Sequence, residues 1–345
     1  MDFLVRRDDL RRCTGVASEP APLEAGQARL AIEAFGLSTN NVTYAVLGDA
    51  VSYWRFFPAP DGWGRVPVWG YATVAESRSE AAPDGARMFG YLPPSAELVV
   101  TPGDADRRRF VDASPHRAGL PGVYNGYVHA DEDRSLDDHR MLLRPLLATS
   151  YLIGADLKDH GFHGARLVVL SSASSKTALG TAFMLRRQGG AQVVGLTSSG
   201  RRAFVEGLGV YDRVVRYEDV EELPAEPAVF VDIAGDAAVR ESVHRHFGDA
   251  LKFSSLVGAT HREALGGAQS LPGPDPVMFF APSVVERRGG LGAEAAAATA
   301  AALEWAGGWL RVERGSGQDA VERAWLTLVD GGSDPAAGYV LSLRA

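Results

Sequence analysis

The segment 165–282 constrains the fold most, because apolar, β-branched runs alternate there with helical patterns. The runs ARLVVLSS, AQVVGLTSS, PAVFVDIAG and DPVMFFAP each contain consecutive apolar residues rather than apolar residues at every second position. Such strands are typical of a parallel sheet covered by helices on both faces. Between the first two runs, SKTALGTAFMLRRQGG has helical spacing and ends in glycine. The sequence therefore predicts an α/β fold built on a Rossmann-type parallel sheet.

The pattern before residue 141 is different. QARLAIEAFGLS, VPVWGYATVAES and AELVVTP predict strands bounded by Pro, Gly and Ser. The tail has two helical stretches and a last strand, GYVLSL. A chain of 345 residues suits two domains. We predict a β-rich domain from residues 1–140 and 285–345, and a nucleotide-binding domain from 141–284. Residues 110–139 look like a long insertion, which is uncommon in a chain unless it has a function.

Charge and cysteine content exclude several function classes. The 35 basic and 43 acidic side chains give a net charge of −8, which argues against nucleic-acid and membrane partners. The one cysteine, Cys13, excludes an internal disulfide and a cysteine-built zinc site. Neither a signal-peptide pattern nor a membrane-spanning run is evident. We therefore expect a cytoplasmic protein.

The turn after the first parallel strand is the expected nucleotide site, because ligands bind at the carboxyl ends of such strands. It reads SSASSKT over 171–177, without the three usual glycines. Small hydroxyl residues and a helix N-terminus can still meet a pyrophosphate. A P-loop is disfavoured because that loop also needs glycines, and simple helix capping by the serines stays open. The predicted cofactor contacts are Ser172, Ser174, Ser175, Lys176 and Thr177.

The end of the second strand bears on cofactor choice. An NAD-selective fold usually places a carboxylate there to bind the ribose 2′-hydroxyl. Here Ser198, Arg201 and Arg202 follow instead. Hydroxyl and guanidinium groups suit a 2′-phosphate. The alternative is a solvated helix start with two surface arginines. If a nucleotide binds, we therefore expect NADPH rather than NADH.

Several segments, taken in order, resemble the medium-chain dehydrogenase/reductase superfamily. They are ARLAIEAFGLSTNNVTYAVLGD, LLRPLLATSYLI, VVLSSASSKTALGTAFML, VFVDIAGD and SSLVGAT. The likeness covers most of the chain and is strongest to the zinc-independent quinone-reductase and enoyl-reductase side. The combination of STNNVTYAVLGD, ASPHRAGLPGVYNGY and LSSASSKT is similar to a bacterial branch designated only as a domain of unknown function.

The resemblance implies a GroES-like catalytic domain beside the nucleotide domain, with the substrate and nicotinamide meeting between them. It maps Asn41 and Tyr44 to the cleft wall, where Tyr44 could stabilise an oxyanion. It maps Thr149 near the nicotinamide carboxamide. The alternatives are that Tyr44 is a core aromatic residue and that Asn41 only forms a turn.

The loop after the fifth strand carries further candidates. Gly258 and Ala259 are small enough to let the nicotinamide ring approach, and His261 could donate a proton. The alternative for His261 is a loop histidine without a catalytic role. The zinc ligands of the zinc-dependent members are missing, so no metal is expected. The aromatic and amide groups of the insertion, among them Tyr124, Asn125 and Tyr127, suit binding; we expect the insertion to reshape the substrate cleft.

The leading functional hypothesis is an NADPH-dependent, metal-independent oxidoreductase that reduces a carbonyl or activated alkene of a small or carrier-bound substrate. The alternatives are a lyase or other non-redox enzyme that lost the cofactor, and a non-catalytic ligand-binding protein. The resemblance also implies a homodimer. DPVMFFAP (275–282) would pair edge to edge in it, since an apolar edge strand is normally not left open. The alternative is a monomer whose edge is covered by residues 291–312.

Overall fold

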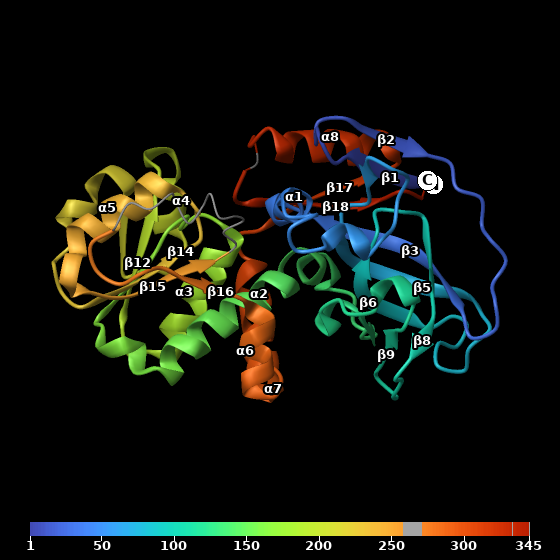
Figure 1. Ribbon diagram of the computed structural model, residues 1–345, viewed down its shortest axis with the longest axis horizontal. Coiled ribbons are helices and arrows are strands. Elements are labelled where there is room, and N and C mark those ends of the chain that lie inside the picture. Colours follow the sequence, from blue (N-terminus) through green and yellow to red (C-terminus); the bar gives the residue numbers. More distant parts are fainter. Residues whose placement is uncertain (258–270, 333, 345) are drawn as a thin grey trace. The chain divides into compact units, whose positions relative to one another are not determined.

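The computed structural model describes residues 1–257, 271–332 and 334–344. The chain divides into two compact units, which are coloured by sequence in Figure 1. Unit 1 is Met1–Leu142 with Leu310–Ala345, and unit 2 is Leu143–Trp309. The first boundary lies two residues from the predicted position at 140. The second lies at Leu310 rather than at 285, so residues 285–309 belong to unit 2.

Packing explains the position of the second boundary. The ring of Trp305 stacks on Phe183 with centroids 5.0 Å apart. The guanidinium of Arg287 lies 2.7 Å from the carboxylate of Asp156. Both contacts hold the segment 285–309 to the helices of unit 2, a tertiary effect that the local sequence pattern did not reveal.

Unit 2 is built on a six-stranded sheet with the order β13-β12-β11-β14-β15-β16. Every neighbouring pair is parallel. This is the strand order of dinucleotide-binding folds, in which the chain reverses direction across the sheet between the first and fourth strands. The strands are β11 (Leu167–Leu170), β12 (Gln192–Thr197), β13 (Arg213–Arg216), β14 (Ala228–Asp232), β15 (Leu251–Val257) and β16 (Val277–Phe279).

Helices cover both faces of this sheet, as Figure 1 shows. Val168 and Leu170 of β11 pack in one buried cluster with Leu179, and Leu167 and Val169 pack in another with Phe247. Alternate residues of one strand are thus buried on opposite faces, which explains its continuous apolar run. Among the described helices, none has the length and hydropathy needed to cross a membrane. The helices are α2 (Asp137–Asp159), α3 (Lys176–Gln188), α4 (Arg202–Gly207), α5 (Ala237–Phe247), α6 (Ala281–Arg288) and α7 (Gly292–Ala306).

Unit 1 holds a nine-stranded sheet with the order β17-β18-β3-β5-β6-β10-β9-β8, in which β7 also pairs with β3. A smaller sheet has the order β2-β1-β4. The elements are β1 (Asp2–Arg6), β2 (Cys13–Val16), β3 (Ala28–Leu37), α1 (Thr39–Val46), β4 (Trp63–Gly64), β5 (Val68–Ser77), β6 (Arg87–Leu92), β7 (Glu97–Val100), β8 (Pro102–Gly103), β9 (Arg109–Asp112), β10 (Gly126–His129), β17 (Arg311–Ser316), α8 (Gln318–Val329) and β18 (Ala337–Ser342).

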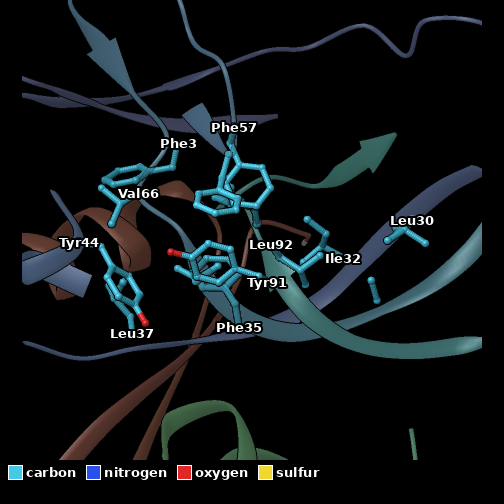
Figure 2. Close-up of a cluster of buried hydrophobic side chains, with 14 of the residues drawn as sticks. Phe3, Leu30, Ile32, Phe35, Leu37, Tyr44, Phe57, Val66, Tyr91 and Leu92 are labelled. Carbon is cyan, nitrogen blue, oxygen red and sulfur yellow. The ribbon is translucent and has the colours of Figure 1, made fainter. Parts of the chain in front are cut away.

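Figure 2 shows the core of unit 1, where Ile32 and Phe35 of β3 meet Tyr91 of β6 and Tyr44 of α1. Strict alternation along β3 would place Ile32 and Phe35 on opposite faces. The pairing with β5 shifts register between Ile32 and Ala34. A β-bulge there adds one residue to β3 and turns Phe35 back toward the core. The same strand then leads directly into α1.

Residues 110–139 are not the long loop that the sequence suggested. Strands β9 and β10 lie in this segment, pair with each other, and join the main sheet through β6. The connection between them carries an ion pair, Arg117 Nε to Asp112 Oδ2 at 2.9 Å, and each side chain is only 1% exposed. Both strands are only four residues long, and polar residues flank them, so their periodicity was too short to read.

The buried ion pair yields a stability prediction. Arg117→Met leaves the Asp112 carboxylate buried without its cation, which should cost about 3–5 kcal/mol of unfolding free energy. Arg109→Met removes only exposed ion pairs and should cost about 1 kcal/mol or less. Urea unfolding of both variants measures the difference.

The double variant Asp112→Asn/Arg117→Met should recover part of that loss, because the amide keeps an acceptor for the amide of Thr101 without a buried charge. Equal stability of the Arg117→Met and Arg109→Met variants would contradict the prediction.

The edge strand β16 is the exposed apolar edge that the sequence predicted. Among the described strands, β15 is its one partner. Three apolar residues in or next to β16 are exposed: Val277 by 52%, Met278 by 45% and Phe280 by 46%. Open apolar edges invite pairing with another chain. The homodimer therefore stays our prediction, with β16 as the contact.

Light scattering should give twice the chain mass of 36.7 kDa. Met278→Lys should shift the protein toward monomer, because a charge on the edge opposes pairing. Leu291→Lys, which changes another exposed apolar residue of unit 2, is the control and should stay dimeric. A wild-type monomer in dilute solution would rule out the dimer.

Candidate active site

The turn between β11 and α3 has the features of a phosphate-binding loop in spite of its missing glycines. Ser172 has a φ of +52°, in the left-handed region that glycine usually occupies. Ser175 caps α3, since its Oγ accepts a hydrogen bond from the amide of Ala178 at 3.2 Å. The first-turn amides of a helix lack partners within the helix and suit an anion. Ser174 lies in this turn, and Lys176 and Thr177 are the first two residues of α3.

A buried polar network, which the sequence analysis missed, joins β11 and β14 where the strand order reverses. Ser171 Oγ donates to Asp232 Oδ1 at 2.9 Å and accepts from the amides of Ile233 and Ala234, both at 2.8 Å. Arg240 Nη1 donates to Asp232 Oδ2 at 3.1 Å. Ser171 directly follows β11, and Asp232 ends the neighbouring strand β14. The runs VVLSS and FVDIAG, in which a polar residue follows a buried apolar strand, were therefore a usable signal for this network.

Neighbouring strand ends converge on the same turn. The amide of Ala173 donates to the carbonyl of Leu196 at 2.9 Å, which ties the turn to β12. The amide of Ser172 donates to the hydroxyl of Tyr217 at 3.0 Å. Tyr217 begins the short 3₁₀ helix Tyr217–Glu222 directly after β13. The sequence analysis missed Tyr217, although its place after a strand of the parallel sheet was a usable signal.

The residues expected at a 2′-phosphate follow β12. Ser198 is exposed and precedes the turn Ser199–Arg201, and Arg202 begins α4. Arg202 Nε pairs with Glu206 Oε1 at 2.7 Å, with both side chains about half exposed. Arg216, at the end of β13, lies in register with Thr197 at the end of β12. The structure thus adds Arg216 to Arg201 and Arg202 as an arginine near the end of β12.

Arg216 is itself ion-paired. Its guanidinium contacts the carboxylates of Asp219 and Glu218. Any phosphate that bound here would have to compete with these carboxylates and with Glu206.

Thr149 lies on α2, and its Oγ1 donates to the carbonyl of Pro145 at 3.4 Å. The next residue, Ser150, donates to the carbonyl of Thr177 at 2.9 Å and so ties α2 to the start of α3. A Cβ on Gly180 would lie 2.7 Å from Ser150 Oγ. Gly180 therefore permits the close packing of α2 against α3. This packing holds the helix that carries Thr149 against the helix that follows the candidate nucleotide turn.

Asn41 and Tyr44 lie on α1 in unit 1. Asn41 is buried; its Oδ1 accepts from the amide of Ser38 at 2.8 Å and its Nδ2 donates to the carbonyl of Pro67 at 2.9 Å. Both ends of the amide therefore hold the start of α1. This fixes the helix that carries Tyr44 one turn later.

Tyr44 is buried, with its ring 4.7 Å from that of Tyr53 and 5.8 Å from that of Tyr91. Its hydroxyl accepts a hydrogen bond from Trp69 Nε1 at 3.4 Å. Burial raises the pKa of Tyr44 well above its ordinary value. The hydroxyl therefore keeps its proton at physiological pH and can act as a hydrogen-bond donor.

Gly258, Ala259 and His261 lie outside the described residues, so their predicted roles stay predictions. Within the described ranges, no group of three or more His, Cys, Asp or Glu side chains is placed to hold a metal ion.

Solved structures share the fold over nearly the whole chain. CurA from Vibrio vulnificus in complex with NADPH has a TM-score of 0.65 at 12% identity, covering 100% of this chain and 99% of that one. CurK enoyl reductase has a TM-score of 0.56 at 13% identity, covering 99% of each. The yhdH oxidoreductase from Salmonella enterica in complex with NADP has a TM-score of 0.54 at 14% identity, covering 96% of this chain and 95% of that one. A sequence search of curated proteins found no match.

These identities are low, so the likeness shows the fold. It confirms the predicted fold class, a Rossmann-type domain with a β-rich second domain as in the medium-chain dehydrogenases/reductases. The family described as a protein of unknown function (DUF2855) matches residues 35–334, which is most of the chain. This agrees with the resemblance to a branch designated by such a domain, and the chain therefore belongs to the DUF2855 family, on a medium-chain dehydrogenase/reductase fold.

Proposed function

We propose that the chain is an NADPH-dependent oxidoreductase that needs no metal and reduces a carbonyl or activated alkene of a small or carrier-bound substrate. One observation carries the proposal: the β11–α3 turn is fixed at the point where the strand order reverses. Dinucleotides bind at that point in this class of sheet. Neighbours of the same fold are described as complexes with NADPH and NADP. The single cysteine suits a cytoplasmic compartment.

The residues of unit 2 fit NADPH. Ser174, Ser175, Lys176 and Thr177 at the start of α3 would receive the pyrophosphate. Ser198, Arg201 and Arg202 would bind the 2′-phosphate. Arg216, at the end of the neighbouring strand β13, would be a further contact. The Arg202–Glu206 pair is about half exposed, so solvent screens it and it contributes little to stability. A phosphate could therefore displace Glu206 at low cost.

Bound NADPH supplies the hydride in such a reaction. In unit 1, Tyr44 would donate a hydrogen bond to the substrate oxygen on which negative charge develops. Its raised pKa keeps the hydroxyl protonated, and the hydrogen bond from Trp69 leaves that proton available. Asn41 orients α1, Thr149 would meet the carboxamide, and Tyr44 or water would supply the final proton.

A second candidate is a non-redox enzyme on the same scaffold, with a ligand-binding protein as the third. The observation that favours them is the nucleotide turn itself. It lacks the glycine fingerprint, and the amide of Ser172 is bound by Tyr217 rather than open to a phosphate. Nucleotide binding therefore separates the candidates.

NADPH at about a hundred times its Kd should stabilise the protein by about 2.7 kcal/mol, seen as a rise in melting temperature. Arg201→Ala/Arg202→Ala should weaken NADPH binding by roughly one to two decades, because a charge-assisted bond is worth about 1.5–3 kcal/mol. NADH binding should barely change. Nicotinamide fluorescence measures both dissociation constants.

The matched control is Arg186→Ala/Arg187→Ala, which removes two arginines from the far end of α3. It should leave both nucleotides unaffected. Equal losses for NADPH and NADH would show that Arg201 and Arg202 do not bind the 2′-phosphate. A wild-type protein that neither nucleotide stabilises would favour the non-redox candidates.

Tyr44→Phe should lower kcat by about 10²–10³-fold, as removal of one oxyanion donor does. The NADPH dissociation constant should stay unchanged, because Tyr44 lies in unit 1. The measurement is NADPH consumption with an enone, aldehyde or quinone that the wild-type protein reduces. Tyr339→Phe, on β18 of the same unit, is the control. An unchanged kcat in Tyr44→Phe would leave Tyr44 as a core residue only.

A further inference from the structure

Unit 1 contains a cavity of about 400 Å³ that is not lined by any of the candidate site residues. Three parts of the chain form its wall, namely Arg7 directly after β1, residues 48–59 after α1, and His116. Its volume lies within the range of about 300–1,000 Å³ that is common for ligand sites. Arg7, Arg55 and His116 are exposed, so solvent reaches the cavity. We call it the Arg7–Arg55 cavity.

The buried part of the wall is Trp54, which is only 3% exposed. A side chain on Gly48 or on Gly64 would overlap the indole, so the backbone packs directly against the ring at both places. The neighbouring Ser52 has a φ of +63°, in the left-handed region that residues other than glycine rarely adopt. Such backbone persists where the surrounding structure holds it, often at ligand sites. The wall is therefore fixed before any ligand binds.

Arg7 is held in a way that leaves donors available. Its Nε donates to the carbonyl of Trp63 at 2.7 Å, and its guanidinium lies 5.5 Å from the ring centre of Trp54. Its Nη1 is 3.8 Å from Asp49 Oδ1, which is beyond hydrogen-bond distance, and the Asp49 side chain is 81% exposed. Among the described residues, the Nη groups of Arg7 have no hydrogen-bond acceptor. Their N–H groups can therefore donate to a ligand.

Arg55 and His116 add two further groups to the wall. Arg55 Nη2 makes one long hydrogen bond, to the carbonyl of Ala118 at 3.4 Å. His116 Nε2 donates to the carbonyl of Phe56 at 3.2 Å, so Nδ1 of the neutral ring carries no proton and can accept one. Burial, followed by the charge of Arg117, lowers the pKa of His116, and the ring is therefore neutral at physiological pH.

The charges around the cavity favour an anion. Two guanidiniums face one exposed carboxylate, in a chain whose net charge is −8. Guanidinium groups bind the oxygens of phosphates and carboxylates through charge-assisted hydrogen bonds. Only the phosphate also suits His116: a phosphate monoester has a second pKa of about 6, so part of it carries a P–OH group that a neutral imidazole accepts. A carboxylate has lost its proton at neutral pH and offers no such donor.

We propose that the Arg7–Arg55 cavity binds the phosphate group of a small phosphate monoester: Arg7 and Arg55 donate to its oxygens, and His116 accepts from the protonated oxygen. Asp49 opposes this binding, because its carboxylate competes for Arg7 and repels the ligand. This site goes beyond the proposed function, since all its residues belong to unit 1 and it requires no nucleotide.

The first test uses three ligands with the same three-carbon skeleton, which are glycerol 3-phosphate, glycerate and glycerol. Calorimetric titration of the full chain should show binding of glycerol 3-phosphate. Glycerate should bind about tenfold more weakly, the size of one charged hydrogen bond, and glycerol should not bind. Equal binding of glycerate and glycerol 3-phosphate, or no binding of glycerol 3-phosphate, would overturn the proposal.

The second test uses variants that should change the affinity in opposite directions. Arg7→Gln and Arg55→Gln should each weaken glycerol 3-phosphate binding by about tenfold or more, because each removes a charge-assisted hydrogen bond. Asp49→Asn should tighten it by about two- to fivefold, the size of an exposed ion pair. Arg12→Gln, which changes an exposed arginine outside the cavity, is the matched control and should bind as the wild type does.

The opposite directions separate recognition from folding, since a variant that only perturbs unit 1 has no reason to bind more tightly. Melting temperatures measured without ligand show which variants fold as the wild type does. Arg55→Gln keeps the test decisive if Arg7→Gln loses stability with its hydrogen bond to Trp63. Wild-type affinity in both Arg7→Gln and Arg55→Gln would reject the site.

The candidate nucleotide site of unit 2 could also attract a phosphate, and Arg201→Ala/Arg202→Ala tells the two sites apart. This variant should bind glycerol 3-phosphate as the wild type does, and saturating NADPH should not displace that ligand from the wild type. Loss of binding in this variant, or displacement by NADPH, would place the phosphate in unit 2 and overturn the proposal. Binding that depends on Arg7 and Arg55, in a protein that neither nucleotide stabilises, would support the cavity and reject the proposed reductase.

Discussion

The buried carboxylate of Asp232 holds together the part of unit 2 on which the candidate nucleotide site depends. It accepts hydrogen bonds from Ser171, which directly follows β11, and from Arg240 on α5. Because β11 and β14 flank the reversal in strand order, this carboxylate fixes two strand ends and the first turn of the site together. A buried carboxylate is stable only when it is fully paired. The candidate nucleotide site therefore has a rigid base.

That rigid base explains how the turn can lack glycine. In dinucleotide folds, glycine provides a left-handed backbone and close packing. Here Ser172 adopts the left-handed conformation and Tyr217 binds its amide. Gly180 provides the close approach of α2 to α3. The left-handed backbone of the turn is thus provided by a serine rather than by a glycine, and the contact with Tyr217 holds it in place.

Unit 1 uses a second buried ion pair in a similar way. Asp112 and Arg117 organise the connection between β9 and β10, and Arg117 reaches the backbone of Tyr124. The register shift in β3 brings Phe35 into the core with Ile32. Together these features place Tyr44, Tyr91 and Tyr124 in one cluster, although they are far apart in the sequence. Figure 2 shows Tyr44 and Tyr91 within this core.

The sequence by itself determined the fold class, because strands buried on both faces must be continuously apolar, and that pattern is visible in VVLSS and VFVDIAG. The sequence also led to the prediction that the turn 171–177 and Tyr44 are candidate site residues. Only the tertiary structure decided that residues 110–139 contribute to β9 and β10, that 285–309 belongs to unit 2, and that Asp232 and Tyr217 contact the turn of the candidate nucleotide site. The physical reason is that these features depend on contacts between residues far apart in the sequence, and a buried ion pair or polar network leaves no periodic pattern in the sequence.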